Sequence, residues 1–133
     1  MGTFGLGHDV VDVAAFAEQL SEPGSRMRSL FSVREVRQAA DRARLKNDDE
    51  AVHLSAKWAG KEAFLKAAGT GLREPFALRE IEAVRLESGA PAYRFSGATA
   101  RWVADHGLTA HLSLSHDGGM ALAFCILETA PET

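Results

Sequence analysis

The stretch WAGKEAFLKAAGTGL, residues 58–72, carries the pattern that decides the fold of this sequence. It belongs to a run without helix breakers that predicts one long helix over residues 51–68, ended by Gly69. On that helix Glu62 and Lys66 are four residues apart and therefore share one face. The sequence thus predicts a mostly apolar helix that carries a Glu/Lys pair and ends in a glycine-rich turn.

The Glu62–Lys66 pair has two interpretations. A glutamate four residues before a lysine is an ordinary surface pair, which stabilises a helix by only about 0.2–0.5 kcal/mol. The same face, however, also carries Trp58 and small residues, and the Gly-Thr-Gly at residues 69–71 offers backbone N–H groups. Such a surface would let a bulky anion approach the point charge of Lys66. The glycines alone are weak evidence, because Gly69 is also explained as a helix cap.

Upstream, the stretch TFGLGHDVVDV, residues 3–13, mixes β-branched residues with glycines and predicts a short strand, in which Gly5 and Gly7 let the backbone bend or pack closely. Asp9 lies near the end of this strand. An isolated carboxylate at such a position is commonly a turn former or a helix cap. Paired in space with Glu62, it would instead supply two oxygen ligands with open positions, which suit Mg²⁺ shared with a phosphate-bearing substrate.

Further helices are predicted on both sides of the long one. Apolar residues recur at helical spacing over residues 12–20, and residues 97–107 form a short helical pattern closed by glycine. Ser32 followed by Glu35 is the signature of a capping box that starts another helix.

Two β-hairpins complete the predicted elements. Residues 78–96 partly alternate around a turn at Gly89, with Pro91 at a strand start, and residues 109–128 form a second hairpin. Its second strand is almost wholly apolar and should be central in the sheet. We therefore predict an α+β fold, a single compact domain over residues 1–133 in which a small antiparallel sheet packs against the long helix.

Composition excludes several classes of function. The 133 residues are 46% hydrophobic, as expected for a globular domain, and the formal net charge of −3 argues against nucleic acid as a partner. No apolar run approaches the roughly 20 residues that a membrane helix needs, so we expect no membrane partner. The single cysteine, Cys125, excludes an intrachain disulfide and favours a reducing, cytoplasmic setting.

His116 ends the strand HLSLSH, beside the turn of the second hairpin. A lone histidine at a strand end is commonly exposed and incidental, and the alternative is a partly cationic donor to a phosphate. The other histidines show no metal-ligand spacing, and the patterns G-x-S-x-G, H-E-x-x-H and G-x-x-x-x-G-K-[ST] are absent from the sequence.

Four pieces in this order, GLGHDVVDV, FSVRE, WAGKEAFLKAAGTGL and HLSLSHDGGMA, resemble the 4′-phosphopantetheinyl transferases of the holo-acyl-carrier-protein synthase type. The resemblance spans roughly Phe4 to Glu128, and W-x-x-K-E-A-x-x-K-A is its most specific part. It implies the 4′-phosphopantetheinyl transferase fold. It also implies transfer of the phosphopantetheine arm of coenzyme A to a serine of an apo acyl carrier protein, with release of adenosine 3′,5′-bisphosphate.

The resemblance also implies roles for particular residues. Asp9, Glu62 and Lys66 correspond to the catalytic residues, of which Asp9 and Glu62 would hold Mg²⁺ against the pyrophosphate of coenzyme A. The residues implied for coenzyme A binding are Lys57, Lys66, Gly89, Pro91 and His116. Relatives of this short type are homotrimers with the coenzyme A site between neighbouring subunits, so we expect a homotrimer.

Two departures from the resemblance affect the expected partners. The first predicted helix carries no basic residue to meet an acidic carrier, which favours a carrier domain within a type I fatty-acid or polyketide synthase. The acidic residues Asp48, Asp49 and Glu50 stand where relatives can offer basic side chains to the 3′-phosphate. Two alternatives stay open: a non-catalytic carrier- or nucleotide-binding module, and an Mg²⁺-dependent pyrophosphate hydrolase.

Overall fold

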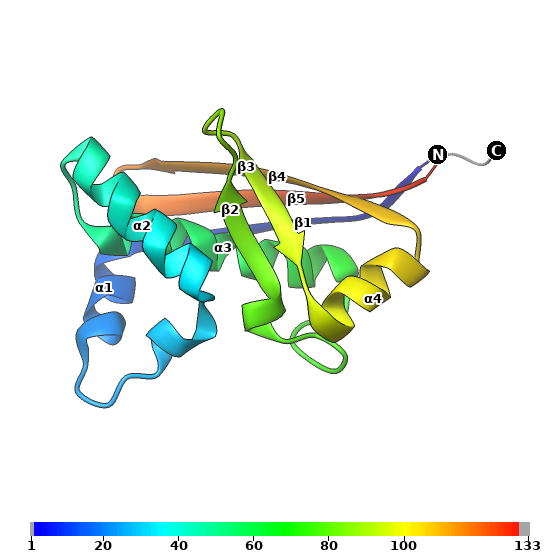
Figure 1. The fold of residues 1–133 in the computed structure, drawn as a ribbon, viewed down its shortest axis with the longest axis horizontal. Coiled ribbons are helices and arrows are strands. Elements are labelled where there is room, and N and C mark those ends of the chain that lie inside the picture. The colour runs from blue at the N-terminus through cyan, green and yellow to red at the C-terminus, as the bar shows by residue number, and fades with distance from the viewer. Residues whose placement is uncertain (1, 131–133) are drawn as a thin grey trace.

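A long helix lies between a three-stranded sheet and a β-hairpin in the computed structural model, which describes residues 2–130 (Figure 1). The elements follow in the order β1 Thr3–Asp12, α1 Val13–Ser21, α2 Val33–Lys46, α3 Glu50–Ala68, β2 Ile81–Arg85, β3 Pro91–Phe95, α4 Gly97–Asp105, β4 Leu108–Asp117 and β5 Met120–Thr129. This confirms the α+β prediction. Residues 1 and 131–133 of the predicted domain lie outside the described residues.

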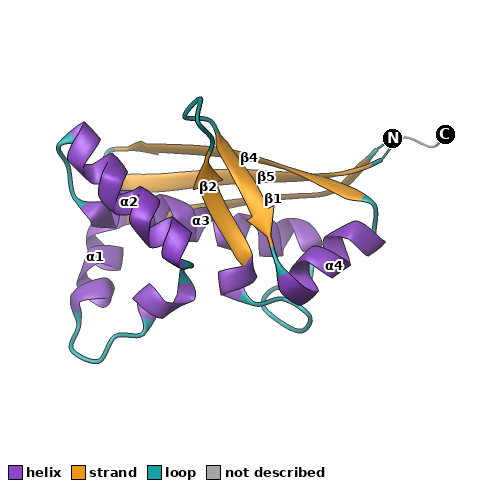
Figure 2. Ribbon diagram, in the orientation of Figure 1, coloured by secondary structure: helices purple, strands orange, loops and turns teal. Residues whose placement is uncertain are grey.

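The long strands form one antiparallel sheet in the order β1-β5-β4. The central place of β5 confirms the prediction from its apolar sequence. One face of β5 is buried under α3, and the helices lie on that side of the long strands (Figure 2). The predicted short first strand is longer than expected, ten residues, because it pairs with β5 along almost its whole length.

Two glycines bring α3 into contact with the backbone of β1. A Cβ atom on Gly5 would lie 1.8 Å from the carbonyl oxygen of Ala67, and one on Gly7 would lie 2.0 Å from that of Ala63. No side chain fits at either distance. The prediction that these glycines permit close packing is confirmed, and the close packing places α3 directly over the strand that carries Asp9.

The helix ends follow the predicted caps. Ser32 and Glu35 form both hydrogen bonds of a capping box at the start of α2. The Asp49 side chain accepts a hydrogen bond from the N–H of Ala51 at the start of α3, and Gly69 ends that helix with φ of 84°. Of the 19 residues of α3, 14 are buried, so this helix runs through the core rather than along its surface.

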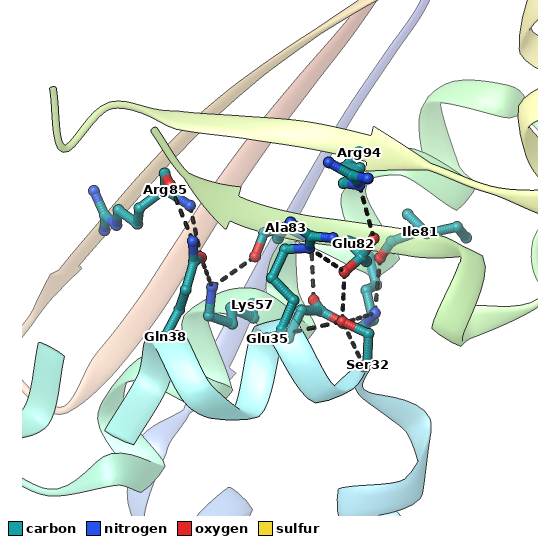
Figure 3. Close-up of polar contacts among 11 residues, drawn as sticks. Ser32, Glu35, Gln38, Lys57, Ile81, Glu82, Ala83, Arg85 and Arg94 are labelled. Carbon is teal, nitrogen blue, oxygen red and sulfur yellow. Dashed lines mark hydrogen bonds and ion pairs between the residues drawn. The ribbon is translucent and has the colours of Figure 1, made fainter. Parts of the chain in front are cut away.

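The hairpin of β2 and β3 is a separate two-stranded sheet. The edge of β2 that faces away from β3 is covered by side chains instead of a strand (Figure 3). Glu35 accepts from the N–H of Ala83, and Gln38 both accepts from the N–H of Arg85 and donates to its carbonyl. Lys57 donates to the carbonyl of Ala83. The backbone groups of this edge are therefore satisfied without a third strand.

Candidate active site

Asp9, Glu62 and Lys66 converge where β1 meets α3. Because strand side chains alternate, Asp9 lies on the same face of β1 as Gly7, the face that α3 covers. The ammonium nitrogen of Lys66 is 3.0 Å from Oδ1 of Asp9. Glu62 lies one helical turn before Lys66 and lines the same groove as Asp9. The structure thus brings together the three residues predicted to be catalytic.

The groove beside these residues has a volume of about 290 Å³ and opens between β1, α1 and α3. Its lining residues are Asp9, Val10, Val11, Asp12, Ala15, Phe16, Gln19, Trp58 and Glu62. One wall is aromatic, and Asp12 caps α1 through the N–H of Ala15. Three carboxylates, those of Asp9, Asp12 and Glu62, therefore line a groove with partly apolar walls.

The charges in the groove act on one another. Burial raises the pKa of the Glu62 carboxyl, and the neighbouring charge of Asp9 raises it further, against the opposing effect of Lys66. Asp9 is largely buried, with 16% of its side chain exposed, whereas the side chain of Lys66 is 53% exposed. The ammonium group of Lys66 is therefore accessible to a ligand from solution while it stays paired with Asp9.

The carboxylates of Asp9 and Glu62 fit a hard divalent cation that takes most of its remaining ligands from water and substrate. No group of three or more His, Cys, Asp or Glu residues able to hold a metal occurs within residues 2–130. Mg²⁺ is commonly bound through one or two protein carboxylates, with water and substrate phosphate completing the shell. The like-charge repulsion between Asp9 and Glu62 is the kind that such a cation would relieve.

Lys57 lies away from this groove, although it is on the same helix. It is buried, with 4% exposed, and its ammonium donates to the Ala83 carbonyl at 2.7 Å and to Oε1 of Gln38 at 3.2 Å. Burial lowers the pKa of Lys57 to about 8, because both acceptors are neutral; the charges of Glu35 and Glu82 only partly offset the loss of water and the repulsion from Arg85 and Lys61.

His116 and Lys57 line one small cavity, whose other lining residues are Gln38, Ala39, Arg42, His53, Ala56, Arg85 and Leu114. The ring of His116 meets that of His53 edge to face, with centroids 6.4 Å apart. The sequence prediction missed Arg42, Arg85 and His53. These residues lie on three separate elements, which only tertiary packing brings together. The one local sign that Arg42 belongs to this cavity is its i, i+4 spacing from Gln38 on α2.

Gly89 and Pro91 form the turn of the β2–β3 hairpin, as predicted. Gly89 has φ of 92°, which favours glycine, and its carbonyl accepts a hydrogen bond from Arg85 at 2.9 Å. Pro91 begins β3 opposite Arg85. Neither residue lines the groove of Asp9 or the cavity of Lys57, so the predicted site residues fall into three groups.

Comparison with known proteins assigns the chain to a family. The sequence profile described as "4'-phosphopantetheinyl transferase superfamily" matches residues 5–125. The chain belongs to this superfamily. It is 46% identical to the holo-[acyl-carrier-protein] synthase of Bifidobacterium adolescentis, over 93% of this chain and 98% of that protein. It is 40% identical to the synthase of the same name from Mycobacterium ulcerans, over 98% and 100%.

Solved structures of the superfamily share the fold. The acyl carrier protein synthase of Mycobacterium tuberculosis superposes with a TM-score of 0.75 at 37% identity, over 97% of this chain and 100% of that one. The ACPS–CoA complex of Chronobacterium ammoniagenes gives a TM-score of 0.75 at 34% identity, over 96% and 98%. Within residues 2–130 no helix has both the length and the apolar character that crossing a membrane would require.

The acidic stretch Asp48, Asp49 and Glu50 is engaged internally. Oδ1 of Asp48 is 2.6 Å from Nε2 of His53, Asp49 caps α3, and Glu50 forms an ion pair with Arg28. These carboxylates therefore organise the start of α3. The cationic side chains that line the same cavity as His116 are those of Arg42 and Arg85.

Proposed function

We propose that this chain is a holo-acyl-carrier-protein synthase, which transfers the 4′-phosphopantetheine arm of coenzyme A to a serine of an apo acyl carrier protein and releases adenosine 3′,5′-bisphosphate. The observation that carries this proposal is the convergence of Asp9 and Glu62 on one groove, with Lys66 paired to Asp9. The support from relatives is that holo-[acyl-carrier-protein] synthases align with the chain over nearly its full length.

The chemistry follows from the charges that develop during transfer. The serine oxygen forms a bond to the β-phosphorus, the bond to the leaving phosphate oxygen breaks, and negative charge accumulates on the leaving group. Lys66, half exposed beside Asp9, would neutralise that charge. Asp9 and Glu62 would hold Mg²⁺, which when bound supplies further neutralisation of the pyrophosphate. Glu62, whose pKa is raised, is the candidate to accept the serine proton, directly or through water.

The surface beside the small cavity of Lys57 and His116 is our proposed site for the nucleotide end of coenzyme A, where Lys57, bonded to Gln38 and Ala83, would contribute its charge without direct contact. Support comes from the cationic and titratable side chains that line the cavity, which include Arg42 and Arg85. Gly89 and Pro91 would lie near the pantetheine or adenine, at the tip of the hairpin that carries Arg85.

The carrier partner is proposed to be less acidic than a free carrier protein, as in a carrier domain of a type I synthase. Helix α1, which borders the groove, offers no basic side chain. Transfer rates to an integrated carrier domain and to a free acidic carrier protein, compared at two salt concentrations, test this. We expect the integrated domain to be modified faster with a weaker salt dependence, and equal rates with equal salt dependence would contradict the proposal.

A homotrimer is likewise proposed. The face of the long sheet opposite α3 exposes large apolar side chains from β1 and β5, namely Leu6, Val10, Phe124 and Ile126. Faces of this kind commonly mark protein contacts. Light scattering of the purified protein should give three times the chain mass, and Phe124→Lys should lower it.

The enzyme is proposed to act in the cytoplasm, where buried Cys125, whose pKa burial raises to about 11, would stay reduced.

One assay distinguishes the candidate functions. The protein is incubated with coenzyme A, Mg²⁺ and an apo carrier, and the carrier is then weighed by mass spectrometry. A mass gain of one phosphopantetheine supports transfer. Cleavage of coenzyme A without a mass gain would indicate a pyrophosphate hydrolase, and neither event would indicate a non-catalytic binding module. Omission of Mg²⁺ should abolish the mass gain.

A further inference from the structure

Lys61, the immediate neighbour of Glu62, is fully buried in an ion pair with fully buried Glu35. Its ammonium nitrogen lies 2.7 Å from Oε1 of Glu35 and 2.7 Å from the carbonyl oxygens of both Leu78 and Ile81. An ammonium group has three donors, and all three are used here. Lys61 is thus bound at three points within the core, with no donor left for a ligand.

Glu35 connects this lysine to two other elements (Figure 3). Its Oε1 also accepts from the N–H of Ser32, which caps α2, and its Oε2 accepts from the N–H of Ala83 on β2. One carboxylate therefore joins α2, β2 and, through Lys61, α3. A change in the rotation of α3 about its axis would break this set of bonds.

Two contacts on different sides of α3 bear on its rotation. On the β1 side, Ala63 and Ala67 meet Gly7 and Gly5, whereas on the α2 and β2 side Lys61 meets Glu35. The first contact relies on small side chains, and six residues of α3 are alanines, at positions 51, 56, 59, 63, 67 and 68, each of which offers a single carbon atom to resist a turn of the helix. A buried ion pair contributes little net stability but demands one geometry, and such pairs set register in some proteins. The Lys61–Glu35 pair is a buried ion pair of this kind, and it acts on α3.

The rotation of α3 decides where Glu62 and Lys66 point. Successive helical residues are about 100° apart, so Glu62 points toward the groove while Lys61 points toward α2 and β2. A rotation of about 20° would move a side-chain end roughly 6 Å from the axis by about 2 Å. A misplacement of about 1 Å can already lower a rate roughly 10²-fold.

We propose that the Lys61–Glu35 ion pair is a positioning device: it fixes the rotation of α3 so that Glu62 and Lys66 face Asp9. The inference rests on the proposed function for its catalytic consequence, although the rotation itself can be measured without activity. Lys61 acts through Glu62 and Lys66, and has no contact with substrate.

The test replaces the pair by neutral side chains of similar shape, in the double variant Lys61→Met/Glu35→Gln. A neutral replacement of a buried pair is often tolerated, so we expect a folded protein. A crystal structure should show α3 rotated by more than about 10°, a change that displaces Glu62 relative to Asp9. The dissociation constant for Mn²⁺, measured by electron paramagnetic resonance, should rise at least about 10-fold, and kcat for transfer should fall about 10- to 100-fold.

Glu82→Gln is the matched control. Glu82 is a buried carboxylate of the same region, bound by Ser32 on α2 and paired with Arg34 and Arg94, and within residues 2–130 it has no hydrogen bond or ion pair with α3. This variant should lower the melting temperature but leave kcat, Mn²⁺ affinity and the rotation of α3 unchanged.

The outcomes separate this inference from the proposed function. A double variant whose α3 superposes on that of the wild type, with unchanged Mn²⁺ affinity, overturns the inference. Wild-type protein that modifies no carrier overturns the proposed function, while the crystal structures still decide the rotation. If the double variant does not fold, Glu35→Gln alone is measured in the same way. Failure of both to fold overturns the inference, because the pair would then be needed for folding itself.

Discussion

Two sides of α3 use the same residue types for different purposes. On the side facing β1, Glu62 lines an open groove, and Lys66, whose side chain is half exposed, pairs with Asp9 of the same groove. On the side facing α2 and β2, Lys57 and Lys61 are buried and donate only to internal acceptors. The difference lies in the partners, since Lys66 meets a carboxylate that solvent can also reach, whereas Lys61 meets a carboxylate fully enclosed by protein.

This comparison shows why a charge pattern on a helix cannot be interpreted without its surroundings. A lysine at an open site contributes little to stability, because water screens it, and remains available to a ligand. A lysine enclosed in the core is costly to leave unpaired and is unavailable to a ligand. We therefore expect substitutions on the two sides of α3 to separate activity from stability.

The largest expected effect is on the buried side. Lys61→Met leaves Glu35 enclosed without its counter-charge, and removal of one partner of a buried pair commonly costs about 3–5 kcal/mol. The free energy of unfolding, from urea denaturation followed by circular dichroism, should fall by that amount. A loss below about 1 kcal/mol would show that Glu35 finds other compensation, and the distinction between the two sides would weaken.

The next effect is on the open side. Glu62→Gln keeps the size of the side chain but removes a charge from the groove, so we expect kcat for carrier modification to fall about 10²- to 10³-fold, or roughly 3–4 kcal/mol. Lys66→Ala should give a loss of similar size. The thermal unfolding of both variants should match that of the wild type, and full activity in either would contradict the proposed mechanism.

The pH dependence of stability probes Lys57. Its pKa is about 8 in the folded protein, against the ordinary lysine value of 10.5 in the unfolded chain. Below pH 8 the lysine is charged in both states. Between pH 8 and 10.5 the folded protein releases the proton first, the unfolded chain binds more protons, and the free energy of unfolding should rise with pH.

The rise attributable to Lys57 should total about 3 kcal/mol over that range. Urea denaturation of the wild type and of Lys57→Met at several pH values between 7.5 and 10 measures it as a growing difference between the two proteins. A constant difference over this range would mean that Lys57 is not as desolvated as its contacts indicate.

The smallest expected effect is that of Lys66→Met on stability. The pair with Asp9 is half exposed on the lysine side, and such pairs contribute about 0–1 kcal/mol. We expect a change in the free energy of unfolding within about 0.5 kcal/mol, measured beside Lys61→Met under the same conditions. If the two variants were equally destabilised, the comparison between the two sides of α3 would fail.

Much of the fold could be predicted from local signals. The Ser32–Glu35 capping box, the glycine at the end of α3 and the apolar sequence of β5 each have one dominant structural meaning, and each prediction is confirmed. The length of β1 was underestimated. Its glycines indicated a bend or close packing, but the partner of that packing could not be identified locally, because α3 is more than 50 residues away in the sequence.

The site was only partly accessible to sequence reasoning. The approach of Asp9 to Lys66 could be expected once β1 was placed against α3. The role of Lys61 could not, because its partner Glu35 looks like a complete cap for α2 and shows no second function in the sequence. Likewise, nothing in the local pattern indicates that Lys57 is enclosed, since its acceptors are backbone and amide oxygens.

The covered edge of β2 has a consequence for association between molecules. An uncovered strand edge is a template on which another chain can add a strand, and many proteins guard against this with charged residues or a covering helix. Here the outward N–H and carbonyl groups of Ala83 and Arg85 are already bonded to Glu35, Gln38 and Lys57. The outer edge of β2 is thereby closed to the addition of another strand, and detachment of α2, which carries Glu35 and Gln38, would expose most of these groups.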